Sequence, residues 1–241
     1  MKRLIALALL ASVAFAAYPN LQLWYRAQDT TGAATTIDCS GNGRNGTISG
    51  SKVCATARNQ QCWYFDGTGD YVATPSFGLS GTVVVFAAWV RCDSNTTINQ
   101  AFIGDNGEGA TANFLVCYRP KLTAAFWWDY GTGSAIKADT SSGFFLGYKD
   151  KWLHVADVCD YTGAKNYIYR NGVLVHTGTL TTPAFPSTAR VRYVGSYNTT
   201  ASMLTAGYMA DVQLWTLATM PPLAVMNASV ARIAAGLMPV W

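Results

Sequence analysis

The chain has 241 residues, of which half are hydrophobic and 12% are charged, with 17 Lys and Arg against 13 Asp and Glu. The basic residues form no stripe and do not interleave with aromatic residues, so no nucleic-acid partner is predicted. No segment reaches the roughly 20 apolar residues of a membrane-spanning helix, so no membrane span is expected. The composition instead suits a well-filled core under a surface of Thr, Ser, Asn and Gly.

The first 16 residues have the pattern of a secretory signal peptide. Lys2 and Arg3 give a charged start, Leu4–Val13 is a short apolar stretch, and the Ala-Phe-Ala of residues 14–16 fits a small-x-small cleavage site. A retained membrane helix is disfavoured because the apolar stretch is too short. We therefore expect a secreted, extracellular protein whose mature chain begins near Ala17.

Most predicted elements of the remaining chain are short β-strands, because β-branched and aromatic runs alternate with turn residues. Asn171-Gly172 predicts a two-residue hairpin turn, since both residues tolerate the positive φ of a type I′ turn. Only residues 221–237 show helical spacing, with a loop as the alternative. The predicted strands are residues 21–26, 61–66, 71–74, 82–92, 101–103, 113–118, 122–128, 135–138, 152–159, 166–170, 173–179, 190–194 and 207–215.

Short strands at this density predict an all-β protein built as an antiparallel sandwich. No run of Pro, Ser or charge divides the chain and no internal repeat occurs, so residues 17–241 are expected to form a single domain. Residues 82–90 are almost continuously apolar, which suits a strand covered on both faces.

An even number of cysteines in a chain that carries a secretion signal favours disulfide bonds. If all six are oxidised, at least one bridge joins the three cysteines before residue 63 to the three after residue 91. Spacing alone leaves about 15 connectivities open, and free buried thiols are the alternative. The six are Cys39, Cys54, Cys62, Cys92, Cys117 and Cys159.

Four Asn-x-Ser/Thr sequons make the chain a candidate glycoprotein if its host is a eukaryote. They lie at Asn45, Asn95, Asn198 and Asn227.

Several phrases occur in an order that resembles the laminin-G-like branch of the concanavalin A-like lectin and glucanase superfamily. The resemblance implies a jelly-roll sandwich of two curved antiparallel sheets with a short C-terminal helix, binding glycans or proteins, often with calcium at one rim. Asn171 stands where relatives usually carry Asp, which keeps the turn but weakens a metal role there. The phrases are residues 38–47, 63–72, 151–156, 167–172 and 207–215.

A catalytic role is not predicted. The retaining glucanases that the chain resembles use two nearby glutamates, whereas Glu108 is the only glutamate here. Neither His154 nor His176 lies beside a Gly-x-Ser-x-Gly elbow, and His154 is expected to pack as a structural residue.

Calcium is the metal that the sequence leaves possible, because it accepts carboxylates and carbonyls from Gly-rich loops. The candidate ligands are Asp38, Asp66, Asp70 and Asp105. The alternative for Asp66 and Asp70, which flank a turn, is hydrogen bonding to the backbone. For Asp105 the alternative is a solvated turn.

The aromatic run around residues 126–130 predicts a ligand-binding surface, because aromatic faces stack on sugar rings. Trp127, Trp128 and Tyr130 are the candidates, and core packing is the alternative. Trp127 and Trp128 are adjacent on a predicted strand, so their side chains are expected to point to opposite faces.

Two functions remain at this stage. The first is a secreted, non-catalytic binding module, lectin-like or adhesive, that recognises a glycan or an extracellular protein. The alternative is a structural subunit of an extracellular coat, filament or sheath, whose ligands are neighbouring copies of the chain. A glycoside hydrolase is less favoured than either.

Overall fold

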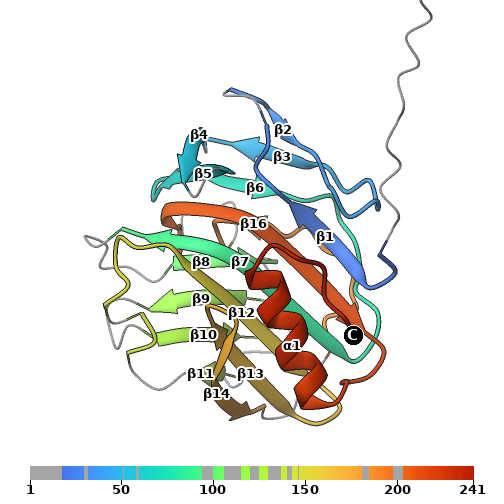
Figure 1. Ribbon diagram of the computed structural model, residues 1–241. Coiled ribbons are helices and arrows are strands. Elements are labelled where there is room, and N and C mark those ends of the chain that lie inside the picture. The colour runs from blue at the N-terminus through green and yellow to red at the C-terminus, as the bar shows by residue number, and fades with distance from the viewer. Residues whose placement is uncertain are drawn as a thin grey trace, which may run out of the picture.

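The computed structural model describes residues 18–29, 32–50, 52–57, 60–93, 100–105, 115–119, 125–129, 137–139, 143–145, 147–180, 185–197 and 203–241. The description covers only the backbone for residues 52–57, 60, 115–119, 125–129 and 137–139. The predicted signal peptide lies outside these residues. Within them the chain forms two β-sheets and one α-helix (Figure 1).

Sheet A has the strand order β14-β13-β12-β7-β16-β5-β4, and β1 also pairs with β16. Its strands are β1 (Leu21–Tyr25), β4 (Lys52–Ala57), β5 (Gln60–Asp66), β7 (Val83–Cys92), β12 (Leu153–Asp160), β13 (Lys165–Arg170), β14 (Val173–Thr179) and β16 (Ala206–Leu217).

Sheet B has the strand order β11-β10-β9-β8-β15-β6-β3-β2. Its strands are β2 (Thr35–Thr36), β3 (Gly46–Ser49), β6 (Tyr71–Ala73), β8 (Gln100–Gly104), β9 (Leu115–Arg119), β10 (Ala125–Asp129), β11 (Lys137–Asp139) and β15 (Tyr193–Val194).

The two sheets pack face to face, and every strand pairing between the described strands is antiparallel. The predicted antiparallel sandwich is therefore confirmed. Strands β2, β3 and β4 were not predicted, because their Thr, Ser, Gly and Lys residues show no apolar alternation. The predicted strand at 190–194 shortens to β15, and Arg190 keeps only an isolated bridge to Phe77.

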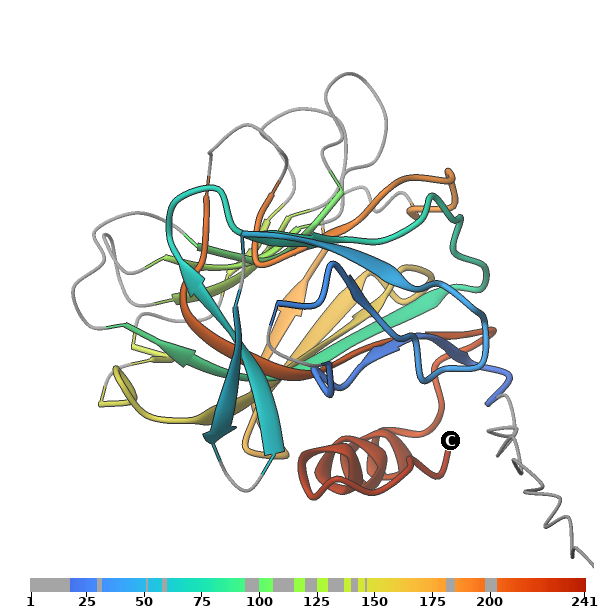
Figure 2. The same cartoon turned by 90° about the horizontal axis from the view of Figure 1, so that it is seen from above.

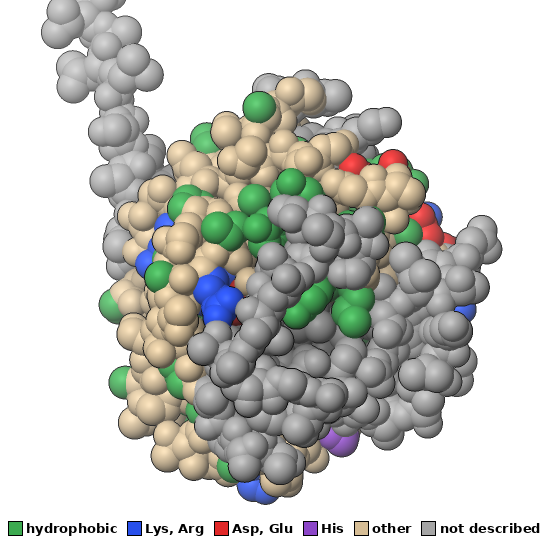
Figure 3. Space-filling view, turned by 180° about the vertical axis from the view of Figure 1, so that it is seen from behind, with side chains coloured by type: hydrophobic (Ala, Val, Ile, Leu, Met, Phe, Trp, Pro, Cys, Tyr) green, Lys and Arg blue, Asp and Glu red, His purple; other side chains and the backbone are tan. Residues whose placement is uncertain are grey.

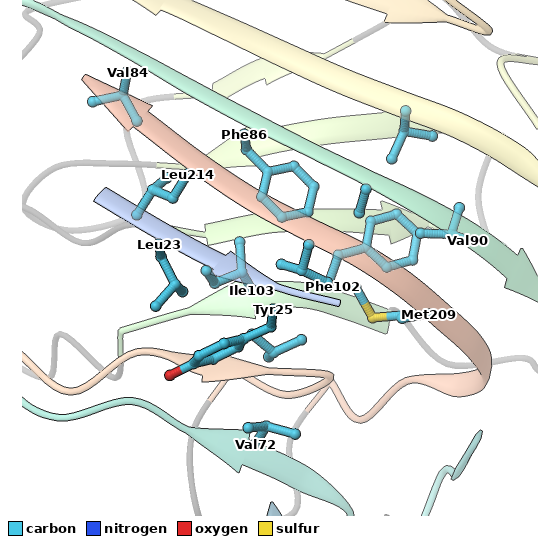
Figure 4. Packing of buried hydrophobic residues seen from close by; sticks show 14 of the residues in the cluster. Leu23, Tyr25, Val72, Val84, Phe86, Val90, Phe102, Ile103, Met209 and Leu214 are labelled. Carbon is cyan, nitrogen blue, oxygen red and sulfur yellow. The ribbon is translucent and has the colours of Figure 1, made fainter. Parts of the chain in front are cut away.

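The main core lies between the sheets. Side chains of β7 and β16 in sheet A meet those of β6 and β8 in sheet B, as Figure 4 shows for Phe86, Met209, Val72 and Phe102. All four are fully buried. Side chains alternate along a strand, so the residues between these core positions of β7 and β16 lie on the outer face of sheet A.

Helix α1 (Leu223–Ala234) covers part of that outer face (Figure 2). The helix begins after Pro222, and the sequence prediction of a helix within residues 221–237 is confirmed. Met226, Val230 and Ile233 are buried against a second core cluster that includes Val85 of β7. Leu223 is 43% exposed, because it lies in the first turn, at the edge of the contact.

The hairpin between β13 and β14 has the predicted turn. Asn171 and Gly172 both have positive φ, at 50° and 80°. Helix α1 crosses this turn so closely that a Cβ atom on Gly172 would lie 2.9 Å from the Cα of Ala231 and 3.2 Å from the Cβ of Ala234. The helix therefore packs directly on the backbone of the turn, at a position with room only for glycine.

We expect Gly172→Ala to destabilise the protein more than Gly147→Ala. Both glycines have φ of 80°, but a Cβ on Gly147 meets nothing within 4 Å. Each substitution carries the left-handed backbone cost of about 1–2 kcal/mol, and only Gly172→Ala adds the clash with α1. Urea denaturation of both variants measures the difference in free energy of unfolding. Equal losses would show that the helix contact contributes nothing.

The core contains one carboxyl group without exposure to water. Asp157 of β12 is fully buried, and its Oδ1 accepts a weak hydrogen bond from the Cys159 Sγ at 3.8 Å. Burial raises the pKa of Asp157 well above its usual range, and hydrogen bonds from Cys159 and Asn166 oppose that shift only in part. Folding therefore favours the protonated acid.

This burial predicts a pH dependence of stability. The unfolded Asp157 ionises near pH 3.9 whereas the folded group holds its proton, so its contribution is fully present below that pH and is lost as pH rises toward the folded pKa. Asp157→Asn should remove this decline and be more stable than the parent chain at neutral pH. Denaturation at a series of pH values, with the exposed Asp66→Asn as control, tests it. Parallel curves for the parent and Asp157→Asn would contradict the prediction.

Candidate functional site

The burial of β7 changes along its length. Residues from Val83 to Ala88 are buried on both faces, whereas Trp89 and Arg91 are only half-buried and alternate with buried Val90 and Cys92. In Figure 1, α1 lies over the right-hand part of sheet A and leaves the left-hand part, where β7 ends and β12 begins, outside its cover. The change in burial therefore marks the edge of the helix contact.

Four half-buried side chains gather on this part of the outer face. Tyr64 lies between core residues of β5, Tyr208 precedes buried Met209 of β16, and Trp152 directly precedes buried Leu153 of β12. Arg91 of β7 completes the group. We call Tyr64, Arg91, Trp152 and Tyr208 the Tyr208 cluster.

Tyr208 is the centre of this cluster. Its ring centroid lies 4.9 Å from that of Tyr64 and 6.2 Å from that of Trp152, with the planes inclined by 47° and 55°. The guanidinium carbon of Arg91 lies 4.9 Å from the Tyr208 ring, a distance suited to a cation–π contact. The cluster combines apolar ring surface with a guanidinium that can donate hydrogen bonds to a ligand.

A second aromatic contact lies next to the cluster. Trp89 of β7 packs edge-on against His154 of β12, with ring centroids 5.2 Å apart. His154 is only 1% exposed, which confirms that it packs as a structural residue. Trp89 is half-buried and extends the aromatic surface by one position along β7.

Acidic groups lie at the rim beside the cluster. Desolvation raises the pKa of Tyr64, and the nearby Asp93, Tyr208, Asp66 and Asp70 raise it further. Figure 3 shows the opposite face of the molecule, seen from behind, where acidic side chains are visible at the upper right. The rim beside the cluster can accept hydrogen bonds from ligand hydroxyl groups.

Asp93 is the rim carboxyl group closest in sequence to Arg91. Partial burial raises its pKa, the nearby Asp150 raises it further, and Arg91 opposes both effects. Asp93 is held in place by its backbone N–H, which donates to the Ala206 carbonyl at 3.1 Å. A hydrogen-bond acceptor, Asp93, and a donor, Arg91, are therefore close enough to affect each other at this edge of the cluster.

Of the four predicted calcium ligands, Asp66 and Asp70 lie at this rim, and both bond to the backbone as the alternative expected. The Asp70 carboxylate accepts from the Asp66 N–H at 2.9 Å, and Asp66 Oδ1 accepts from the Thr68 N–H and hydroxyl, each at 2.7 Å. Among the described residues, no three His, Cys, Asp or Glu side chains form a group that could hold a metal ion.

Asp38 organises a loop. Its carboxylate accepts hydrogen bonds from the backbone N–H groups of Trp24, Ser40 and Arg44 and from the Ser40 hydroxyl, at 2.7–3.1 Å. Its own N–H donates to Oδ1 of Asn45 at 3.0 Å. With 6% exposure, this carboxylate is committed to the loop at residues 38–45.

Asp105 lies in a different electrostatic setting, beside buried Arg192. Burial lowers the pKa of Arg192 to about 10, while Asp105 opposes that shift. Arg192 Nη1 donates to the Phe77 carbonyl at 2.7 Å, and the guanidinium carbons of Arg44 and Arg192 lie 4.0 and 4.4 Å from the Phe77 ring. Asp105 is itself buried and interacts electrostatically with the buried Arg192, so it does not lie in a solvated turn.

The predicted aromatic candidates lie on or beyond β10. The backbone of this strand includes Trp127 and Trp128, paired with Cys117 and Val116 of β9. Their side chains, and the whole of Tyr130, lie outside the described residues, so their ligand-binding role stays a prediction. Sequence reasoning missed the Tyr208 cluster, although an aromatic residue alternating with core residues on several strands was a signal for it.

The cysteines and sequons are distributed as follows. Cys92 and Cys159 are buried thiols. Cys159 of β12 pairs with Val84 of β7, which lies eight residues, or about 26 Å, from Cys92 along the same strand. Cys92 and Cys159 are therefore too far apart to form a disulfide with each other. Cys39 is a half-buried thiol, and Cys54 lies opposite Cys62 in the β4–β5 register. The backbone of Cys117 belongs to β9. Disulfide bonding stays a prediction.

Two of the four sequons lie in the described part of the chain. Asn45 is exposed in a loop, whereas Asn227 lies within α1 and accepts a hydrogen bond from the Tyr169 hydroxyl at 2.8 Å. Asn95 and Asn198 lie outside the described residues. Asn45 is the more accessible of the two described positions for glycosylation. Among the described helices, none is long and apolar enough to cross a membrane.

Comparison with known families identifies the fold. A laminin-G-type profile, described as concanavalin A-like lectin/glucanases superfamily, matches residues 66–222, more than half of the chain. The chain belongs to the concanavalin A-like lectin/glucanase superfamily. This confirms the resemblance seen in the sequence. None of the curated proteins matches the sequence.

Solved structures of this jelly-roll type are similar in fold. Domain 4 of the GH43 extracellular arabinanase AbnA from Geobacillus stearothermophilus, in complex with arabinotriose, matches with a TM-score of 0.65 and 16% identity over 89% of this chain and 98% of that one. The receptor binding domain of botulinum neurotoxin D matches with a TM-score of 0.64 and 12% identity, over 90% and 52%.

The ligand binding domain of botulinum neurotoxin serotype D, in complex with N-acetylneuraminic acid, matches with a TM-score of 0.62 and 13% identity, over 90% of this chain and 51% of that one. The chain thus spans about half the length of these toxin domains. At such identities the similarity is one of fold alone.

The Asp38 network makes a prediction about the loop next to β1. Asp38→Ala removes the acceptor of four hydrogen bonds and should lower the free energy of unfolding by about 2–4 kcal/mol, with faster proteolysis within residues 38–45. Asp38→Asn keeps one acceptor oxygen and should lose less. Urea denaturation and limited proteolysis measure both effects. An unchanged Asp38→Ala variant would show that the network is not needed for the fold.

Proposed function

We propose that the protein is a secreted, non-catalytic, lectin-like module that binds a glycan on the Tyr208 cluster. The observation that carries the proposal is the cluster itself, in which Tyr64, Trp152 and Arg91 surround Tyr208 on a sheet face beyond the cover of α1. Aromatic faces take up the C–H surfaces of sugar rings, while charged neighbours bond the hydroxyl groups. Both kinds of group are present within a few ångströms of Tyr208.

The similar structures support this proposal. One of them was solved with arabinotriose and another with N-acetylneuraminic acid, so domains of this fold bind sugars in those proteins. Secretion is supported by the signal-peptide pattern of residues 1–16. The non-catalytic role is supported by the single glutamate of the chain, since Glu pairs perform hydrolysis in the glucanases that it resembles.

A second candidate function is a structural subunit of an extracellular assembly. Strand β14 is an edge strand of sheet A and contains no Lys, Arg, Asp or Glu. Val173 and Val175 on it are 64% and 39% exposed. An uncharged edge strand with exposed valines can pair with another chain, which favours self-association.

A glycan array with the mature chain tests the proposed function. Trp152→Ala and Tyr208→Ala should each weaken binding about tenfold, because each removes ring surface worth roughly 0.5–1.5 kcal/mol together with its apolar burial. Tyr208→Phe, which keeps the ring, should bind like the parent chain.

Tyr193→Ala is the matched control, since Tyr193 packs against Tyr71 at 5.5 Å on sheet B. Loss of binding in Tyr193→Ala but not in Tyr208→Ala would place the site on the other sheet and contradict the proposal. Binding to no glycan, together with oligomers in size-exclusion chromatography, would favour the structural subunit. Release of new reducing ends from a bound glycan would contradict the non-catalytic role.

A further inference from the structure

The Tyr208 cluster forms a row that runs across the strands. Tyr208 pairs in register with Tyr64 of β5 on one side and with Arg91 of β7 on the other. Leu153 of β12 pairs with Val90, so Trp152, one residue earlier, lies beside Arg91. The row therefore crosses from β5 over β16 and β7 to the start of β12.

The length of this row exceeds one sugar ring. Neighbouring strands lie about 4.8 Å apart, so the step from β5 to β7 alone spans about 10 Å. The ring centroid of Tyr64 lies 4.9 Å from that of Tyr208, and the ring centroid of Trp152 lies 6.2 Å from it. A single pyranose or furanose ring stacks on one aromatic face, which leaves the other two rings without ligand.

We infer that the ligand is a linear oligosaccharide, or an internal stretch of a polysaccharide chain, whose successive sugars lie across β5, β16 and β7. This inference rests on the proposed function and specifies its ligand. The central sugar stacks on Tyr208, and its neighbours lie over Tyr64 and Trp152. Arg91, between Tyr208 and Trp152, donates hydrogen bonds to the hydroxyl groups of the sugars that pass over it.

The inclination of the rings selects the form of the chain. The planes of Tyr64 and Trp152 are turned by 47° and 55° from that of Tyr208. A crystalline polysaccharide surface is flat and would need three coplanar rings. The three rings are not coplanar, so they do not form the flat platform that such a surface would need. The geometry therefore favours a single soluble chain over an insoluble surface.

Titration calorimetry with chains of increasing length tests the inference. The probes are α-1,5-linked arabino-oligosaccharides, β-1,4-linked gluco-oligosaccharides and β-1,4-linked xylo-oligosaccharides of one to six units. In the series that binds, affinity should rise about tenfold or more from one to three units and then level off. Tyr64→Ala and Trp152→Ala, at the two ends of the row, should each flatten this rise, while Tyr193→Ala should leave it unchanged.

Three outcomes would overturn the inference. Equal affinity for the monosaccharide and the trisaccharide would mean that the site recognises a terminal sugar, and the proposed function would stand. Stronger retention on crystalline cellulose than on the soluble chains would mean that the ligand is a flat surface. Binding to no member of the three series would remove these chains as ligands, while the glycan array decides separately on the proposed function.

Discussion

The outer face of sheet A depends on how far α1 extends. Twelve residues of helix bury part of this face, where they pack on Val85 and its neighbours, and the first part of β7 is buried on both sides. Beyond the helix the same strand reverts to alternation, with Trp89 and Arg91 facing outward. A sheet face that is neither covered by a helix nor fully polar is filled by large rings that shield the backbone and still contact water. The position of the candidate site is thus a consequence of the length of the helix.

The two ends of the sandwich use their charges differently. Around Phe77 the guanidinium groups of Arg44 and Arg192 are buried or half-buried, and the carboxylates of Asp38 and Asp105 are turned inward to loop amides and to Arg192. These groups close the end of the core and are occupied within the protein. At the Tyr208 cluster Arg91 and Asp93 are only half-buried, beside rings that are also half-buried. The chemistry available to a ligand is therefore concentrated at the second end.

The sequence was sufficient for the fold, because its apolar alternation, the Asn171-Gly172 turn and the order of its phrases each report local constraints. It did not show β2, β3 and β4, whose residues show no apolar alternation. Pairing holds them in place: β2 pairs with β3, β3 with β6, and β4 with β5. The candidate site was missed in the sequence for a related reason, although its alternating aromatic residues were a signal. Tyr64, Arg91, Trp152 and Tyr208 are separated by 27 to 61 residues along the chain, and only the register of four strands brings them into one row. Trp127 and Trp128 were easy to single out because they are adjacent in the sequence, whereas residues that meet only in the fold are not.

The most direct test of this account is a crystal structure of the mature protein with an oligosaccharide that it binds. The account predicts sugar rings stacked on Tyr208, with neighbouring sugars over Tyr64 and Trp152 and a hydrogen bond from Arg91. Density for the oligosaccharide on sheet B or among the loops beyond β10, with the Tyr208 cluster unoccupied, would contradict it.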